Sequence, residues 1–221
     1  MFDMRPMPAH IDPALIAKLE KVETATVGHV LHSQFANIAL RAVLPEKRVA
    51  GTAVTLQIPG ADSTLLHHLM GMVRPGDFIV IDRCGDTRHA CWGGVITNAA
   101  KLGGVVGAVI DGPATDFNEV RRVGMPLWCS GPSPITTKLL GLEGMLNCPV
   151  SVGGVTVEAG DAVLADESGV LFLKPWQIEE VADRALAMQR SEVELLARLE
   201  KGEKLPEISG ATKMVIAKAR T

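Results

Sequence analysis

The chain has 221 residues, of which 47% are hydrophobic and 21% charged, and its formal net charge is −3. The acidic balance, the absence of a long basic run and the 4% of aromatic residues argue against nucleic acid as a ligand. No segment approaches the roughly 18 to 20 consecutive apolar residues of a membrane-spanning helix, and the N-terminus lacks a secretory signal, so a cytoplasmic protein without membrane contacts is expected. The cysteines form no C-x-x-C pair, which predicts reduced thiols that are small core residues at Cys84, Cys91, Cys129 and Cys148.

The N-terminal part of the chain alternates helical and extended patterns. Apolar residues at helical spacing follow Asp12, which is suited to cap a helix, and they recur before a Pro-Gly-Asp turn. We therefore expect helices over residues 13–19, 26–31 and 63–72, and a strand over residues 49–58.

The central part predicts a βαβ unit. Residues 78–81 and 105–110 are short apolar runs bounded by turn residues, as in strands buried on both faces of a sheet. Between them, apolar residues recur at helical spacing from Gly93 and Gly94 to the glycine pair at residues 103–104. A strand, a helix and a strand in this order form a crossover with two parallel strands.

The C-terminal part predicts short strands and then one long helix. Residues 126–129 resemble a strand, residues 150–173 have the pattern of a β-meander, and residues 178–201 form a charged amphipathic helix. The length of this helix suggests an arm or packing against another subunit. The chain is therefore expected to be a single domain over residues 1–221, with a core at about 25–175 and a C-terminal helical arm at about 176–205.

Two segments share one pattern. Residues 73–82 and 157–166 each pass through a Gly-Asp turn into an apolar strand that ends in aspartate. Because such turns commonly launch strands, we interpret Asp77 and Asp161 as turn residues and not as catalytic aspartates.

The carboxyl ends of the two parallel strands are the expected place for a site. The loops of residues 82–91 and 111–116 and the helix N-terminus at Gly93 and Gly94 all open on this edge. Unpaired backbone N–H groups and the positive end of the helix dipole attract a carboxylate or a phosphate there. Asp116 lies within reach, so the sequence predicts a site for a metal ion and an organic anion.

Simpler explanations of the same residues stay open. Gly93 and Gly94 also suit a tight turn without a ligand, and Asp116 suits the N-cap of a helix that starts near Phe117. Asp111 is interpreted as a strand-end residue that hydrogen-bonds loop backbone rather than as a base.

Several short motifs follow one another in a fixed order over about residues 25–205. They are Gly51-Thr52-Ala53-Val54-Thr55, Pro75-Gly76-Asp77, Trp92-Gly93-Gly94, Asp111-Gly112 with Asp116, and Gly160-Asp161 with Asp166 and Gly169-Val170. In this order they resemble the family that contains the regulator of ribonuclease activity A and the class II 4-hydroxy-4-methyl-2-oxoglutarate (4-carboxy-4-hydroxy-2-oxoadipate) aldolases. The resemblance implies an α/β fold, namely an α/β/β sandwich of the phosphohistidine-swivelling type, with the βαβ unit at the site and a long C-terminal helix. It also implies a homotrimer or a hexamer.

The resemblance further implies roles for single residues. The metal, Mg²⁺ or Mn²⁺, falls on Asp116, and a glutamate from the neighbouring subunit's C-terminal helix, here Glu192, reaches the water shell of the metal. The family's arginine before the metal-binding aspartate falls on Thr115. The positions that bind substrate fall on Gly93, Gly94, Val95 and Ile96.

The chain departs from the family's pattern at Thr115 and at Gly94, where several aldolases carry an acidic residue. Loss of the arginine's charge-assisted contact costs roughly 2 to 4 kcal/mol of transition-state stabilisation unless another group supplies it. Our hypothesis is that a nearby arginine leans into the site, and that the histidine of the loop at residues 82–91 acts as an acid, a base or a water-positioning group. The candidates are Arg88, Arg121 and Arg122 for the first role and His89 for the second.

Two classes of function follow. The first is a divalent-metal-dependent lyase that cleaves a C–C bond of a small 2-oxo acid, by retro-aldol release of pyruvate or by decarboxylation of an oxaloacetate-type acid. The alternative is a non-catalytic regulator that inhibits a ribonuclease by protein–protein contact. Methyl transfer ranks last, because no Gly-x-Gly-x-Gly motif follows a first strand.

Overall fold

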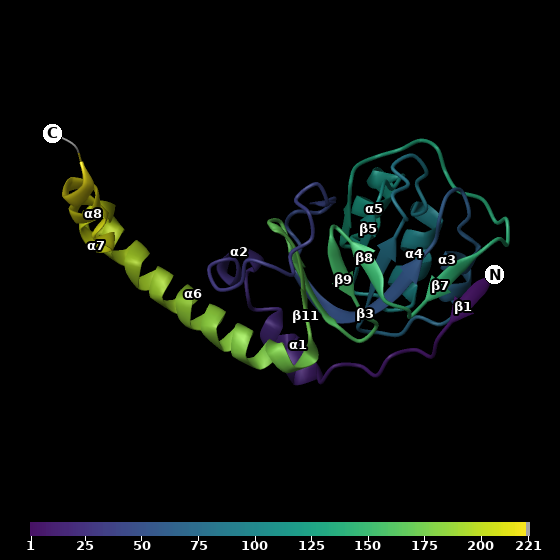
Figure 1. Cartoon of the computed structure of the whole chain (residues 1–221), viewed down its shortest axis with the longest axis horizontal. Coiled ribbons are helices and arrows are strands. Elements are labelled where there is room, and N and C mark those ends of the chain that lie inside the picture. The colour runs from purple at the N-terminus through teal and green to yellow at the C-terminus, as the bar shows by residue number, and fades with distance from the viewer. Residues whose placement is uncertain (220–221) are drawn as a thin grey trace.

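The computed structural model describes residues 1–219 of the chain. The centre of the molecule is a run of parallel strands: β3 (Val49–Gln57), β4 (Asp77–Asp82), β5 (Gly107–Asp111) and β6 (Leu127–Cys129) (Figure 1). Helix α4 (Gly94–Leu102) joins β4 to β5, so the predicted parallel βαβ unit is confirmed.

Further strands extend the sheet on both sides. β2 (Arg41–Ala42) pairs antiparallel with β6 and forms one edge. On the other side, β3 is long enough to pair with two strands in succession, β10 along its first half and β7 at its end. These outer strands are β7 (Gly144–Leu146), β10 (Ala162–Asp166), β1 (Phe2–Met4) beside β7, and β11 (Gly169–Leu173) beside β10.

The two faces of the sheet are covered differently. Alternate residues of a strand point to opposite faces, so Ile79 and Ile81 of β4 face one side, and Phe78 and Val80 face the other. The first side is covered by the helices α3 (Thr64–Leu69), α4 and α5 (Phe117–Val123). The second is covered by β8 (Val150–Val152), β9 (Val155–Val157) and the inward side chains of β10 and β11.

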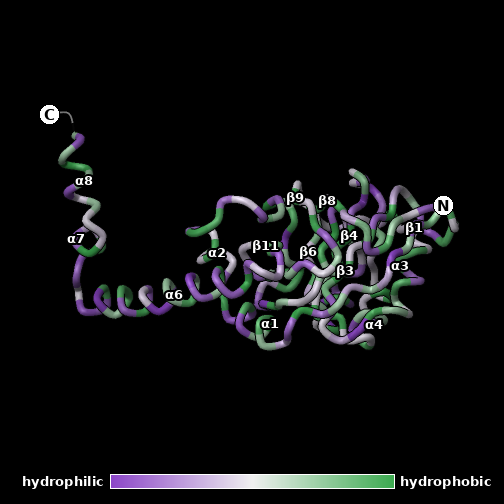
Figure 2. The backbone as a smooth tube through the Cα atoms, turned by 60° about the horizontal axis from the view of Figure 1, so that its bottom comes forward, coloured by the Kyte–Doolittle hydropathy of each residue, from purple (hydrophilic) through white to green (hydrophobic). Residues whose placement is uncertain are grey.

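The C-terminal helices leave this body. Helix α6 (Ile178–Glu200) follows the short 3-10 helix η1 (Pro175–Gln177) and packs with α1 (Pro13–Leu19) against β10 and β11. Its buried residues end at Ala185, and beyond that point it projects outward to α7 (Leu205–Ser209) and α8 (Ala211–Lys218) (Figure 1). Hydrophilic and hydrophobic residues alternate along the projecting part (Figure 2). Within residues 1–219, no helix has both the length and the apolar character needed to cross a membrane.

Two expectations from the sequence were wrong in detail. The helix expected over residues 26–31 is the four-residue α2 (Thr24–Val27), and residues 28–30 continue it only as hydrogen-bonded turns. The cysteines are all free thiols, as predicted, but Cys84 is exposed in the turn after β4, where its φ is +52°.

The turn aspartates behave as the repeated pattern predicts. The Asp77 carboxylate accepts a hydrogen bond from the backbone N–H of Arg74 at 2.8 Å, and the Asp161 carboxylate accepts one from Glu158 at the same distance. Each aspartate therefore closes the turn that precedes its strand. Asp12 likewise caps α1, since its Oδ1 accepts from the Ala14 N–H at 2.8 Å.

Candidate active site

Asp116 lies between β5 and α5 with its backbone in the left-handed region, at φ +55° and ψ +40°. Aspartate tolerates this conformation better than most residues. Asp116 is the N-cap residue of α5, as the simpler explanation predicts, but its side chain makes no capping hydrogen bond to that helix. Instead, Oδ2 accepts a hydrogen bond from the backbone N–H of Gly94 at 2.8 Å. The carboxylate thus occupies the positive end of α4.

The N-terminus of α4 offers further donors beside this carboxylate. The first N–H that bonds back to the preceding chain is that of Thr97, which donates to the Gly93 carbonyl at 2.9 Å. Within residues 1–219, no protein group accepts from the N–H groups of Val95 and Ile96. These two amides are therefore available to an oxygen of a bound anion.

Glycine at position 93 is what allows the loop of Asp116 to come this close. A Cβ on Gly93 would lie 2.8 Å from the Asp116 Oδ2 and 2.9 Å from the Thr115 Cγ2. The backbone confirms the approach, since the Thr115 N–H donates to the Trp92 carbonyl at 2.8 Å. The structure therefore brings together Gly93, Gly94, Thr115 and Asp116.

A second carboxylate, which our sequence reasoning missed, lies beside Asp116. A Cβ on Gly94 would lie 3.5 Å from the Asp116 Oδ2 and 3.0 Å from the Glu119 Cγ. Glu119 Oε1 accepts from the Asn98 amide at 2.8 Å, and Oε2 accepts from the Arg122 Nε at 2.8 Å. The hydrogen bonds from Arg122 and then Asn98 lower the pKa of Glu119 to about 2. The spacing of residues 116, 119 and 122 along one helix was the signal that could have shown this group.

The loop of His89 is organised by Asp86, which was also missed. The His89 Nδ1 lies 2.8 Å from the Asp86 Oδ2, and the N–H groups of Arg88 and His89 donate to Oδ1 at 2.8 and 3.1 Å. Burial opposes ionisation of Asp86, yet these hydrogen bonds outweigh it and lower its pKa. Because Nδ1 is engaged, Nε2 is the nitrogen that His89 can offer to a ligand or to water.

Behind this loop lies the buried side chain of Arg83. Its Nη1 donates to the Ile58 carbonyl at 2.6 Å, and its Nη2 donates to the Gly60 carbonyl. A Cβ on Gly112 would lie 2.8 Å from the Arg83 Cγ, so the arginine packs closely on the start of the loop that carries Asp116. Nothing in the sequence pattern distinguished Arg83 from an exposed loop arginine.

None of the candidate arginines contacts Asp116 within the described residues. Arg122 is paired with Glu119, and the Arg121 guanidinium lies 5.7 Å from the centre of the Phe117 ring. Arg88 is exposed, and its carbonyl accepts from the Ser133 hydroxyl at 2.7 Å. The group next to the Asp116 Oδ1 is the Thr115 hydroxyl, at 3.3 Å.

The aspartates at the ends of the two strands hold the neighbouring hairpin in place. Asp111 Oδ2 accepts from the Gly153 N–H at 2.9 Å, which confirms its interpretation as a strand-end residue. Asp82 Oδ2 accepts from the Gln57 amide at 3.0 Å and from the Ser151 N–H at 3.2 Å. Both carboxylates therefore have structural hydrogen-bond partners.

A divalent cation fits at Asp116 if water supplies most of its other ligands. Within residues 1–219, no three His, Cys, Asp or Glu side chains lie close enough to form a protein-only metal site. Mg²⁺ is commonly held by one or two carboxylates and keeps several waters, a pattern that Asp116 can satisfy through Oδ1. Glu192 lies on the projecting part of α6, away from α4 and α5, so a single chain does not bring it to Asp116 (Figure 1).

The fold is that of a mixed α/β protein. Its candidate site combines the Asp116 carboxylate with free amides at the N-terminus of the crossover helix α4. A model of the RraA-like family, described as Aldolase/RraA, matches residues 24–172, and the chain belongs to this family.

Known proteins support this assignment. A relative from Halalkalibacterium halodurans, provisionally named a 4-hydroxy-4-methyl-2-oxoglutarate aldolase, is 34% identical over 142 residues, 64% of this chain and 67% of the relative. The 4-hydroxy-4-methyl-2-oxoglutarate aldolase of Thermus thermophilus is 32% identical over 126 residues, 57% of this chain and 76% of that protein. The crystal structure of Streptomyces coelicolor RraAS2, an unusual member of the RNase ES inhibitor RraA protein family, superposes with a TM-score of 0.72 at 29% identity. That superposition covers 88% of this chain and 98% of RraAS2.

Proposed function

We propose that the protein is a divalent-metal-dependent lyase that cleaves a C–C bond of a small 2-oxo acid, either by retro-aldol release of pyruvate or by decarboxylation of an oxaloacetate-type acid. The observation that carries the proposal is the Asp116 carboxylate, fixed by the Gly94 N–H at 2.8 Å beside the free amides of Val95 and Ile96. The names of the aldolase relatives favour the same class of reaction.

Each group at this edge has a role in the proposal. Asp116 would hold Mg²⁺ or Mn²⁺, which as a Lewis acid favours the enolate left when the C–C bond breaks. The Val95 and Ile96 amides would bind the substrate carboxylate, and Gly93 lets the Asp116 loop come close to them. His89, held by Asp86 at 2.8 Å, would position water or carry a proton at Nε2.

The proposal also covers the type of fold, the domain organisation, the location in the cell and the oligomeric state. We propose a sandwich of the phosphohistidine-swivelling type and a single domain over residues 1–221 that works in the cytoplasm. Homotrimers or hexamers would bring Glu192 of a neighbouring subunit toward the metal's water shell. Sedimentation velocity would report the oligomer, and Glu192→Gln would weaken metal affinity only if the subunits meet in this way.

The direct test is pyruvate release, followed with lactate dehydrogenase, from oxaloacetate and from 4-hydroxy-4-methyl-2-oxoglutarate. We expect turnover with added Mg²⁺ or Mn²⁺ and its loss on chelation, with recovery when the metal is restored. A folded oligomer that turns over neither acid with either metal would contradict the proposal.

The departure at Thr115 favours a second candidate, a regulator that inhibits a ribonuclease by contact, since the site lacks an arginine beside Asp116. Thr115→Arg separates the two. In an oxo-acid lyase this variant should raise kcat/KM about tenfold, because the guanidinium adds a charge-assisted contact to the substrate oxygens. For a regulator, Thr115→Arg and Asp116→Ala should leave a measured ribonuclease complex unchanged, and no pyruvate should form.

A further inference from the structure

A cavity of about 400 Å³ lies at the edge of the sheet formed by β2 and β6. Its walls come from both strands, from the start of α5 and from the segment after β6, and include Arg41, Val43, Phe117, Cys129, Ser130 and Gly131. Among residues 1–219, Arg41 is the only charged residue that lines it.

Strand register fixes where Arg41 points. Arg41 pairs with Cys129 across the β2–β6 ladder, and Ala42 pairs with Trp128. Cys129 belongs to the core beneath the helices, whereas Trp128 belongs to the opposite core. Paired residues share a face of a sheet, so Arg41 lies on the helix-covered face, at the carboxyl end of β6.

Two polar side chains of this cavity, Arg41 and Ser130, have no protein partner among residues 1–219. Among residues 1–219, Arg41 is exposed and forms no ion pair, and the exposed Ser130 hydroxyl has no hydrogen-bond partner in the protein. The Ser130 backbone N–H, by contrast, is used, since it donates to the Gly112 carbonyl at 3.0 Å. The cavity thus offers a guanidinium and a hydroxyl, and no carboxylate of the described part of the chain lines it.

The cavity adjoins the loop that carries Asp116. Besides the bond from Ser130 to Gly112, the Ala114 N–H donates to the Gly131 carbonyl at 3.0 Å. Phe117, which lines the cavity, follows Asp116 directly in the chain. The segment of residues 112–117 therefore has the Gly94–Asp116 contact at one side and the Arg41 cavity at the other.

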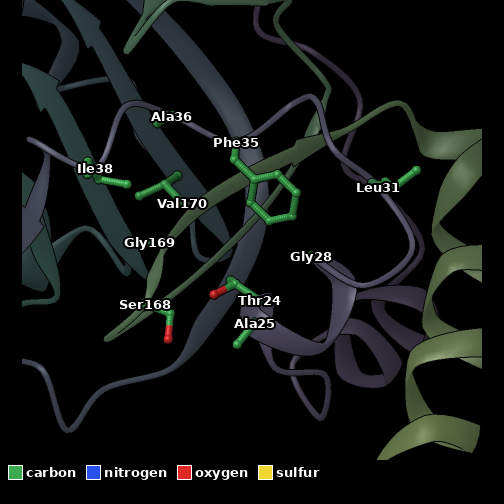
Figure 3. A pocket seen from close by; sticks show the side chains of 10 residues that line it. All are labelled: Thr24, Ala25, Gly28, Leu31, Phe35, Ala36, Ile38, Ser168, Gly169 and Val170. Atoms are coloured by element: carbon green, nitrogen blue, oxygen red, sulfur yellow. The ribbon is translucent and has the colours of Figure 1, made fainter. Parts of the chain in front are cut away.

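A second pocket provides a comparison, because its lining is unsuited to an anion. It measures about 300 Å³ and lies between α2, the segment around Phe35 and the turn at Ser168 (Figure 3). Its lining includes no charged residue, and the Thr24 hydroxyl is already donated to Asp166 at 2.5 Å. An apolar lining of this kind supplies no compensation for a desolvated anion.

We propose that the Arg41 cavity binds a carboxylate or phosphate group, with Arg41 as the cation and the Ser130 hydroxyl as a neutral donor. A guanidinium forms two parallel hydrogen bonds to either group, and the hydroxyl supplies a third. The site requires no metal and no turnover, so it stands whether or not the protein is a lyase.

Binding of two probes to the full-length protein tests this inference. Succinate carries the carboxylate chemistry and inorganic phosphate the phosphate chemistry, and amide chemical shifts report both affinity and place. We expect at least one probe to shift the amides of Arg41 and Gly131 with saturation, and Arg41→Gln to weaken that binding at least tenfold. Arg41→Lys should retain part of the affinity, because the charge stays while the paired geometry is lost.

The matched control is Arg190→Gln on the projecting part of α6. Arg190 is exposed and is not among the residues that line the Arg41 cavity, so this variant should bind the probe as the parent does. Equal weakening in both variants would reveal a non-specific charge effect and overturn the proposal. So would unchanged affinity in Arg41→Gln, or the absence of saturable shifts with both probes.

Discussion

Aspartate has a different role at the amino ends and at the carboxyl ends of the strands in the central sheet. At the amino end of β4, the Asp77 carboxylate is 0% exposed and meets Arg74 Nη2 at 3.0 Å and His10 Nε2 at 2.8 Å. At the amino end of β10, Asp161 meets Lys174 Nζ at 2.9 Å. Beyond the carboxyl end of β5, Asp116 is exposed and, within the described residues, forms no ion pair.

This difference separates structural from reactive carboxylates. A buried carboxylate with a cationic partner and a backbone donor has its lone pairs in use, and removing it leaves those partners unsatisfied. Asp116 has one oxygen fixed by a single N–H and the other held only by a hydroxyl at 3.3 Å. Substitutions at the first kind should change the free energy of unfolding, and substitutions at the second should change activity.

The largest expected effect is on activity, from Asp116→Asn. The amide keeps the shape of the side chain and tolerates a left-handed backbone, but it loses the negative charge that a cation requires. We expect kcat for pyruvate release to fall about 10³-fold, while the free energy of unfolding changes by less than about 0.5 kcal/mol. Stopped assays with Mg²⁺ and urea titrations measure the two quantities.

Asp183→Asn is the control for that variant. Asp183 lies on α6 and pairs with Lys18 at the surface, with 62% of its side chain exposed, so both quantities should stay near the parent values. If Asp116→Asn retained full metal-dependent activity, Asp116 would belong with the structural aspartates.

The next effect is on stability, from Asp77→Asn. Removing the charge leaves the Arg74 guanidinium without its buried counter-ion and breaks the link from β4 to His10 in the N-terminal segment. We expect a loss of about 3 kcal/mol in the free energy of unfolding. Activity per folded molecule should be unchanged, because Asp77 lies at the opposite edge from Asp116. If Asp77→Asn lost activity but kept the parental free energy of unfolding, Asp77 would not be a purely structural aspartate. The distinction between the amino and carboxyl ends of the strands would then be contradicted.

A smaller effect is expected from Gly93→Ala, which adds one methyl group between the two parts of the site. Its Cβ would meet the Asp116 Oδ2 at 2.8 Å and the Thr115 Cγ2 at 2.9 Å, so the loop must move by several tenths of an ångström. We expect a 10- to 100-fold loss in kcat/KM with about 1 kcal/mol of destabilisation.

Gly71→Ala is the matched control for the added methyl group. A Cβ there would meet only the His68 carbonyl at 3.5 Å, an ordinary contact, so activity should be preserved. Parental activity in Gly93→Ala would show that the close approach of the loop has no catalytic importance.

The sequence predicted the parts of the molecule that depend on local patterns. Gly-Asp turns, apolar runs and helical spacing are short-range signals, and they placed β4, α4 and β5 in the correct order and direction. The short α2 shows the limit of such patterns, because apolar spacing continues past Gly28 while the α-helix ends at Val27.

The contacts that define the site could not be predicted because they join distant residues. The bond between Gly94 and Asp116 spans 22 positions, and its geometry depends on the left-handed backbone of Asp116. The position of Arg41 depends on its pairing with Cys129, which only the complete sheet establishes. A local pattern carries no information on such register.

The smallest effect concerns Glu119, a half-buried carboxylate that belongs to neither of these two classes. Its pKa lies near 2 rather than 4.5, because Arg122 and Asn98 stabilise the charged form. The ion pair therefore stabilises the fold above pH 4.5, and this contribution disappears as the pH falls from 4.5 to about 2. Glu119→Gln should lower Tm by about 1–2 °C at pH 7 and by nothing measurable at pH 2. Thermal melts of the parent and Glu119→Gln at both pH values give this difference. An equal difference in Tm at pH 2 would mean that the shape of the side chain, and not its charge, holds Glu119 against Gly94. Glu119 would then be classed with the structural carboxylates.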